Sequence, residues 1–249
     1  MGETRDNLIK MVEAYVSENI HLFHEARINK LSNLKLSTLL KKKNPYLYRA
    51  KDLNTPQEIV ESLADAFLSS AEETMFGDWM EQLAIFVAAQ VYGGRKSTSE
   101  GVDIEMDKDG VHYIVSVKSG PNWSNSSSMN KLVQNFLKAK RIFATSGNKM
   151  PCEAVEGCCY GRGSCRKDSH IKLCGEAFWK FLSGSDTLYT DIVEPLGADA
   201  RVQNEQYAKK YKQKITLFTK EFANEYCLSD GCIDWDKIVR MNSGAGAAK

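Results

Sequence analysis

Two acids and a lysine stand at strand spacing in the stretch Gly101–Trp123, GVDIEMDKDGVHYIVSVKSGPNW. Asp103 and Glu105 are two residues apart, as are Ser116 and Lys118. Side chains alternate between the two faces of a strand, so each pair shares one face. If the two faces coincide, an acid pair and a lysine converge at the end of a hairpin. That grouping suits metal-assisted hydrolysis of a phosphodiester.

Such hydrolysis needs carboxylates that hold a divalent cation, usually magnesium (Mg2+), against a phosphate oxygen. The cation polarises the phosphorus and makes a bound water more acidic. A lysine steadies the attacking water or the developing charge. Asp103 fits the first role and Lys118 the last. The competing interpretation is a solvent-facing hairpin with scattered charges.

The composition is that of an ordinary soluble globular protein, with 43% hydrophobic and 26% charged residues among 249. No apolar run approaches the roughly 18 residues of a membrane span, and the opening MGETRDNLIKMVEAY lacks the apolar stretch of a signal peptide. We therefore expect no membrane contact and a cytoplasmic location. Seven cysteines without a secretion signal agree with a reducing compartment.

Positive charge is concentrated after the lysine of the hairpin. The net charge of +1 indicates nothing about DNA, but the segment from Lys118 to Met150 contains no Asp or Glu. Its basic residues are Lys118, Lys131, Lys138, Lys140, Arg141 and Lys149. A basic segment that follows a strand would suit contact with phosphates, although a solvated helix face has the same composition.

The pattern of apolar residues predicts the elements that must position these groups. Thr55 and Pro56 are typical of a helix start, and the helix that follows has a possible break at Gly77. Asp109-Gly110 is a hairpin turn, and the nearly all-apolar strand after it should be central in a sheet. Helices are predicted at 4–30, 56–91, 129–143, from 175 and at 200–226; strands at 113–117, 152–160 and 171–174; a polar loop at 122–128. This order predicts an α/β domain with a mixed sheet.

Longer strings add a resemblance to known enzymes. The D…SVK pattern on a hairpin, followed by a helix, resembles the PD-(D/E)xK nuclease fold, a central mixed β-sheet flanked by helices. The narrower resemblance is to the PmeII-like type II restriction endonucleases, over about residues 35–243. It rests on KKKNPYLYRAK, SSAEETMFGDWMEQLAIFVA, GVDIEM, SVKSGPNWSNSSSMNKL, GCCYGRG, KLCGEAFWKFLSG and DWDKIVRMNSG.

The resemblance implies that Asp103 is the metal-binding aspartate and Lys118 the catalytic lysine. Ser116 departs from the pattern, because the residue two positions before the lysine is usually Asp or Glu. A hydroxyl is a poor substitute for a carboxylate as a metal ligand. Related nucleases with serine here take the acid from the downstream helix, but that helix offers only the neutral Gln134.

Two candidates remain for the second metal-binding carboxylate. Glu81 lies on the helix before the hairpin, where many members of the superfamily carry an extra acid. Glu105 shares a strand face with Asp103. We favour Glu81 and keep Glu105 as the alternative. Without the resemblance, Glu81 would be interpreted as an exposed helix charge.

Candidate DNA-binding residues follow the lysine. Small, polar and stacking side chains fill the loop after Lys118, and arginine pairs well with guanine in the major groove. The alternative is an ordinary polar turn with Trp123 packed on the core. The candidates are Ser119, Asn122, Trp123 and Asn125 in the loop, Lys131 on the helix, and Arg162, Arg166 and Lys167 in GRGSCRK.

A cluster of cysteines raises the alternative of a zinc site. Five cysteines and one histidine lie within 23 positions, but no CxxC pair occurs and the spacing misses the usual zinc patterns. We favour buried, reduced thiols. The residues are Cys152, Cys158, Cys159, Cys165, His170 and Cys174; Cys227 and Cys232 flank a separate turn.

The sequence thus predicts a type II restriction endonuclease that cuts both strands of a short, roughly palindromic DNA site with magnesium. A homodimer is expected, because twofold sites are matched by twofold enzymes. We expect residues 1–55 to serve dimerisation or DNA contact and residues 56–249 to form the catalytic domain. The resemblance also implies a cognate DNA methyltransferase. The alternatives are a structure-specific repair nuclease, a DNA-binding module with a decayed site, and a zinc-stabilised regulator.

Overall fold

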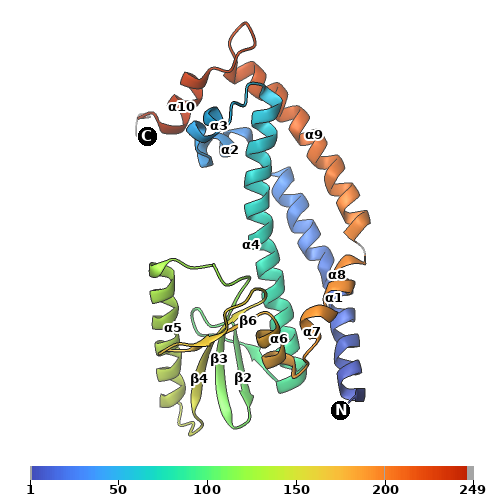
Figure 1. Ribbon diagram of the computed structural model, residues 1–249, viewed down its shortest axis with the longest axis vertical. Coiled ribbons are helices and arrows are strands. Elements are labelled where there is room, and N and C mark those ends of the chain that lie inside the picture. The colour runs from blue at the N-terminus through green and yellow to red at the C-terminus, as the bar shows by residue number, and fades with distance from the viewer. Residues whose placement is uncertain (1, 199, 246–249) are drawn as a thin grey trace. The chain divides into compact units, whose positions relative to one another are not determined.

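The computed structural model describes residues 2–198 and 200–245 (Figure 1). Contacts divide the chain into a sheet-bearing unit, Met1–His21 with Phe76–Ala198, and a helical unit, Leu22–Met75 with Asp199–Lys249. The long helices α1 (Gly2–Ser32) and α4 (Pro56–Tyr92) each contribute residues to both units. Residues from both ends of the chain share the core of the helical unit.

A six-stranded mixed sheet organises the first unit, and its strand order is β1-β2-β3-β4-β6-β5. Strands β3 and β4 and strands β4 and β6 are parallel, and the other neighbours are antiparallel. The strands are β1 (Arg95–Lys96), β2 (Ile104–Lys108), β3 (Val111–Lys118), β4 (Cys152–Cys158), β5 (Cys165–Arg166) and β6 (Ile171–Cys174). The predicted α/β class with a mixed sheet is confirmed, although the short edge strands β1 and β5 were not predicted and β4 ends two residues earlier than expected.

The hairpin β2–β3 has the predicted turn, and it decides whether the face of the acids and the face of the lysine coincide. Asp109 and Gly110 both have positive φ angles, 50° and 76°, which are the angles that a tight two-residue hairpin turn requires. Glu105 is paired with Ile114, which shares a face of β3 with Ser116 and Lys118. Asp103 lies just before β2, and its carboxylate accepts a hydrogen bond from the Ser116 hydroxyl (3.3 Å), so the acid meets this face at the end of the hairpin.

Helix α5 (Ser126–Thr145) makes the crossover between the parallel strands β3 and β4 and covers one face of the sheet (Figure 1). Phe136 and Leu132 of α5 are buried against Ile114 and Ala154 of the sheet. The helix begins three residues before the predicted start at 129. The reason is Asn125, whose side-chain oxygen accepts a hydrogen bond from the Ser128 amide (3.0 Å) and caps the first turn.

Helix α6 (Glu176–Ser183) packs on the opposite face, and the short helices α7 (Leu188–Asp191) and α8 (Val193–Gly197) follow it. Phe181 meets the ring of Tyr113 on β3 edge-on, with ring centroids 5.0 Å apart. A Cβ atom at Gly157 of β4 would lie 2.1 Å from the Phe178 ring. Glycine at 157 therefore allows α6 to approach the sheet.

Helix α4 starts where the sequence predicts but has no break at Gly77. Thr55 and Glu58 form a reciprocal cap, with the Thr55 amide donating to Glu58 (3.0 Å) and the Glu58 amide to Thr55 Oγ1 (3.3 Å). A Cβ at Gly77 would lie 3.3 Å from the Cβ of Ser119. Gly77 therefore serves the close approach of the loop after β3, and the helix continues to Tyr92.

The helical unit buries a core drawn from both ends of the chain. Leu39 of α2 (Leu36–Lys42), Tyr48 of α3 (Pro45–Ala50) and Phe222 of α9 (Ala200–Tyr226) belong to one buried cluster. The range of α9 agrees with the prediction of 200–226, whereas α10 (Trp235–Ser243) was not predicted. No helix in the described part of the chain is long and apolar enough to cross a membrane.

Candidate active site

Asp103 is held at the end of the hairpin by its neighbours on β3. The Val117 amide donates to its carboxylate at 2.6 Å and the Ser116 hydroxyl at 3.3 Å, and both bonds reach the same oxygen, Oδ2. The Asp103 amide in turn donates to the Val115 carbonyl (2.8 Å). The aspartate is therefore fixed by strand pairing at its backbone and by two donors at its side chain.

Lys118 ends strand β3 on the same face as Ser116. Its ammonium donates to the Val117 carbonyl (3.0 Å) and lies 5.0 Å from the centre of the Trp123 ring. An ammonium over an indole face is attracted by the electron-rich ring, so Trp123 limits where this charge can be.

Glu81 approaches the hairpin from α4. Its side chain is 24% exposed, with Lys96 at 3.8 Å. Burial and the charge of Asp103 raise the pKa of the Glu81 carboxyl, while Lys96 and Lys118 act in the opposite direction. Glu81, Asp103 and Lys118 thus form one electrostatic group, although 37 positions of sequence separate the first from the last.

Glu105 of β2 lies on the same face of the sheet as Ser116 but is bound elsewhere. Arg95 contacts its Oε2 at 2.7 Å and the Ser97 hydroxyl donates to its Oε1 at 2.7 Å. Both carboxylate oxygens are therefore used by residues in and next to the edge strand β1. This pairing distinguishes the two candidates for the second carboxylate.

Glu156 of β4 is a charged residue that the sequence analysis missed. It is fully buried, next to Ser116 in the parallel register. Burial would raise the pKa of its carboxyl, but hydrogen bonds from His170 (3.0 Å), Trp123 (2.9 Å) and Lys172 (3.0 Å) outweigh burial and lower the pKa to about 2. The feature of the sequence that could have indicated Glu156 is a single acidic residue within the apolar run AVEGCC.

Taken together, the hairpin end carries two neighbouring carboxylates, an oriented lysine and an ionised buried glutamate. Comparison with known families matches residues 10–204 to the family described as type II restriction endonuclease EcoO109I. The chain belongs to this family. It is therefore a nuclease with a restriction-endonuclease fold, and its substrate is DNA. No curated protein matches the chain.

In this restriction endonuclease, the loops after β3 and β4 pack against each other where the two parallel strands end. A Cβ at Gly120 would lie 2.3 Å from the Tyr160 ring, and one at Gly161 would lie 2.6 Å from Pro121. Ser119, Asn122 and Trp123 are in the first of these loops. Asn125 ends the same loop and caps α5, so its side-chain oxygen already has a structural role.

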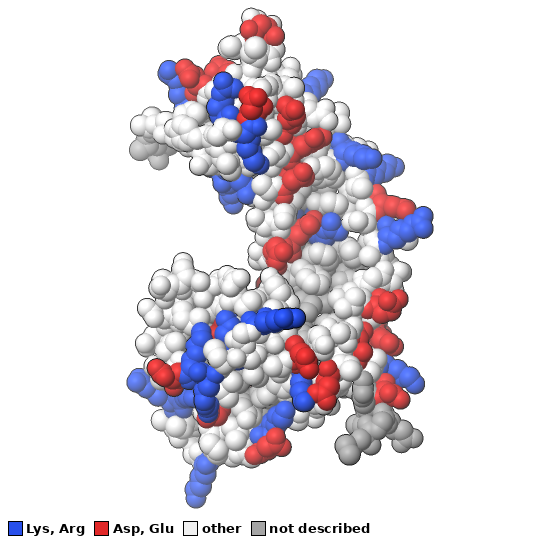
Figure 2. Space-filling model, viewed as in Figure 1, with Lys and Arg blue, Asp and Glu red and all other residues white. Residues whose placement is uncertain are grey.

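The predicted basic contacts are dispersed and mostly paired with acids. Lys131 lies 3.5 Å from Glu100, and Arg166 on the edge strand lies 3.3 Å from Glu153. Lys167 lies 3.6 Å from Glu156, and Arg162 is exposed in the loop after β4. Figure 2 shows basic side chains gathered over the part of the sheet-bearing unit where Figure 1 draws α5. This surface has the charge that DNA phosphates require.

The cysteines of the restriction endonuclease are free thiols. Cys158, Cys159 and Cys174 are buried, whereas Cys165 is exposed. Burial, assisted by Glu81, raises the pKa of the Cys159 thiol to about 12, which disfavours the thiolate that binds zinc. Within residues 2–198 and 200–245, no three His, Cys, Asp or Glu side chains are grouped so that they could hold a metal ion.

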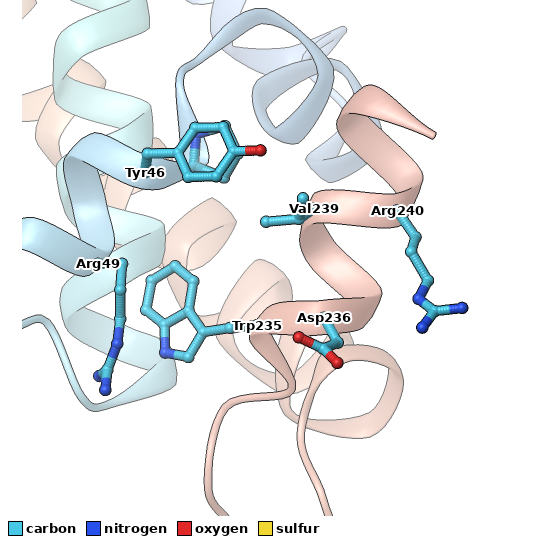
Figure 3. A pocket seen from close by; sticks show the side chains of 7 residues that line it. Tyr46, Arg49, Trp235, Asp236, Val239 and Arg240 are labelled. Atoms are coloured by element: carbon cyan, nitrogen blue, oxygen red, sulfur yellow. The ribbon is translucent and has the colours of Figure 1, made fainter. Parts of the chain in front are cut away.

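A separate groove of about 380 Å³ lies in the helical unit (Figure 3). The basic and aromatic stretch around KKKNPYLYR forms one wall of it, and α10 forms the other. Its lining is Pro45, Tyr46, Arg49, Trp235, Asp236, Val239 and Arg240. One carboxylate and two arginines do not provide the acid pair that metal-assisted hydrolysis needs, so the hairpin end remains the candidate active site.

Proposed function

We propose that the protein is a magnesium-dependent endonuclease that cuts both strands of a short, roughly palindromic duplex site. One observation carries this proposal: the Asp103 carboxylate is fixed at the end of the hairpin by Val117 and Ser116, and both Asp103 and Lys118 act electrostatically on Glu81 of α4. The PmeII-like grouping within the type II enzymes is part of the proposal and rests on the sequence strings quoted above.

The carboxylates fit a magnesium ion. Magnesium in phosphate-processing sites is usually bound by one or two carboxylates, with waters and substrate phosphate as the other ligands. Asp103 and Glu81 would hold it, because burial and the charge of Asp103 raise the pKa of Glu81, and a bound cation would offset both effects. Bound magnesium would stabilise charge on the phosphate and acidify a water. Glu105 suits the role less, since both of its oxygens are bound.

The protein groups around the metal ligands have separate tasks. The Val117 amide and the Ser116 hydroxyl orient the Asp103 carboxylate. The Lys118 ammonium would position the attacking water or stabilise the charge that develops on the phosphate. Ser116 then acts as a donor to a metal ligand and is not itself a ligand, which accounts for a functional site without an acid at this position.

The proposal includes a homodimer, because two strands of a twofold site require two active sites. We assign dimerisation or DNA contact to the N-terminal helices, residues 1–55. A cognate DNA methyltransferase that protects the host site completes the proposed restriction-modification pair.

The test is digestion of unmethylated phage DNA by the purified protein, with magnesium and with EDTA. Discrete magnesium-dependent bands are expected, and sequencing of the fragment ends would give the site. A smear would indicate a structure-specific or repair nuclease. A gel shift in calcium without cleavage in magnesium, on DNAs of varied sequence, would indicate a DNA-binding module with a decayed site.

A further inference from the structure

We propose that Glu156 is a positioning residue for the catalytic lysine: it holds the Trp123 indole, and the face of that ring holds the Lys118 ammonium. This inference rests on the proposed function. Glu156 would not touch the substrate and would act only through Trp123.

The contacts of Glu156 exclude it from the metal site and make it a fixed anchor. Its Oε1 accepts from Trp123 (2.9 Å) and Lys172 (3.0 Å), and its Oε2 meets His170 (3.0 Å) and Lys167 (3.6 Å). A fully buried carboxylate with both oxygens bound cannot reorient cheaply, because each lost bond would leave a buried charge or donor unpaired.

Trp123 connects this anchor to the active site. Its indole N–H donates to Glu156, while its ring lies 5.0 Å from the Lys118 Nζ. A tryptophan ring is rigid, so a hydrogen bond at the nitrogen fixes the plane on which the ammonium rests. Without that bond, both the ring and the flexible four-carbon side chain of Lys118 would sample more positions.

Lys172 of β6 fixes the same loop at a second point. It donates to Glu156 and also to the Pro121 carbonyl (3.0 Å). The loop after Lys118 is thus held at Pro121 and at Trp123 by a single buried network. Strands β4 and β6 therefore both contribute to the placement of the Lys118 side chain on β3.

The network also gives a physical reason for serine at position 116. Ser116, Glu156 and Lys172 form a row across β3, β4 and β6 at one level of the sheet, and the Ser116 hydroxyl reaches the Asp103 carboxylate just before β2. Adjacent strands are roughly 4.8 Å apart, so an acid at 116 would lie between two other carboxylates. A neutral hydroxyl avoids this repulsion while still donating to Asp103.

Single-turnover cleavage at saturating enzyme and magnesium tests the proposal, with four variants. Trp123→Phe keeps an aromatic face but loses the N–H, and Trp123→Leu loses both. Glu156→Gln keeps an acceptor for the indole, and Glu156→Leu removes it. We expect rate constants that fall on the order of tenfold in Trp123→Phe and Glu156→Leu, fall further in Trp123→Leu, and fall least in Glu156→Gln.

The amplitude of the reaction separates positioning from folding. A purely structural role would lower the fraction of active enzyme and leave the rate constant of the surviving molecules unchanged. If Glu156→Leu does not fold, Trp123→Phe removes the same hydrogen bond without leaving Lys172 unpaired. In metal-free wild-type protein, the Trp123 indole proton should exchange slowly with solvent by NMR, and in Glu156→Gln it should remain protected.

The outcomes are distinct. Wild-type rate constants in both Trp123→Phe and Trp123→Leu would overturn the inference and leave the proposed function intact. A fast-exchanging indole proton in the wild-type protein would also overturn it. A wild-type protein that cuts no DNA under any metal condition would overturn the proposed function and this inference with it.

Discussion

At the scale of single residues, the site is defined by how each charge is paired. Glu81 and Glu105 are both partly buried glutamates with different partners, and burial together with the charge of Asp103 raises the pKa of the Glu81 carboxyl. Glu105 is neutralised by Arg95. A buried charge that is only partly paired with opposite charges commonly marks a functional position, because it does not stabilise the folded state.

Asp103→Asn and Lys118→Met should each lower the cleavage rate by roughly a hundredfold or more, because each removes a charge needed in the transition state. Site binding, measured by gel shift in calcium, should stay within a few-fold of the wild-type value. Loss of binding and cleavage in equal measure would instead indicate a recognition or folding role for these residues.

Glu81→Gln should abolish magnesium-dependent cleavage and raise the melting temperature in EDTA at neutral pH. A carboxyl whose pKa is raised in the folded state contributes most to the free energy of unfolding at low pH. That contribution is lost as the pH rises through the folded-state pKa. A neutral glutamine has no such loss. Calorimetry across pH checks the sign.

Glu105→Gln is the matched control for this experiment. It removes the same charge from the same strand face as Asp103, so its cleavage rate should change only a few-fold. If Glu105→Gln abolishes cleavage and Glu81→Gln does not, the second metal ligand is Glu105.

At the scale of elements, helix α5 and strand β4 position the loop that carries Trp123. Asn125 starts α5 where the loop ends, and β4 supplies the buried carboxylate that holds the loop from beneath. The loop is therefore fixed by its own cap on one side and by a neighbouring strand on the other.

Asn125→Ala should destabilise the protein by about 1 kcal/mol, because the Ser128 amide loses its partner in the first turn of α5. Asn130→Ala, an exposed position inside the same helix, should be neutral or slightly stabilising. Urea denaturation of the two variants measures the difference. Equal free energies of unfolding would show that the cap contributes nothing.

Strand β4 should also make the protein sensitive to acid. The folded-state pKa of Glu156 is lowered to about 2. The ionised side chain therefore contributes fully to the free energy of unfolding above the ordinary pKa of 4.5, and this contribution is lost as the pH falls toward 2. The contribution is on the order of a few kcal/mol. Acid titration followed by circular dichroism should show a weaker pH dependence in Glu156→Gln over this interval.

At the scale of the whole molecule, the chain combines a sheet-bearing unit that carries the candidate active site with a helical unit built from both ends of the chain. The family match over residues 10–204 includes parts of both units. The match therefore extends beyond the sheet-bearing unit into residues 22–75 of the helical unit, and it ends near the start of α9.

The proposed homodimer predicts a mass in solution of about twice 27.9 kDa. Sedimentation equilibrium across a range of concentrations measures it, and plasmid cleavage adds a functional readout. A dimer should convert supercoiled DNA to the linear form in one binding event. A monomer that accumulates nicked circles before linear product would contradict the prediction.

Local signals in the sequence were sufficient for much of the fold. Asp109-Gly110 specifies its turn by the φ angles it tolerates, Thr55 and Glu58 cap α4 within one turn, and α9 follows its apolar stripe. These features depend on residues close in sequence, so the sequence by itself determined them.

Only the tertiary structure decided which charges meet. Gly77 suggested a possible helix break, and its contact with Ser119 joins residues 42 positions apart in the sequence. Glu105 was the alternative to Glu81 as a metal ligand, and its pairing with Arg95 depends on the edge strand β1, which was not predicted. In the sequence, Glu156 cannot be distinguished from an ordinary strand residue. In the structure, Lys172 of β6 and the ring of His170 bind its carboxylate. The energy of a buried carboxylate depends on partners that long-range packing brings within hydrogen-bond distance, and no local pattern encodes those partners.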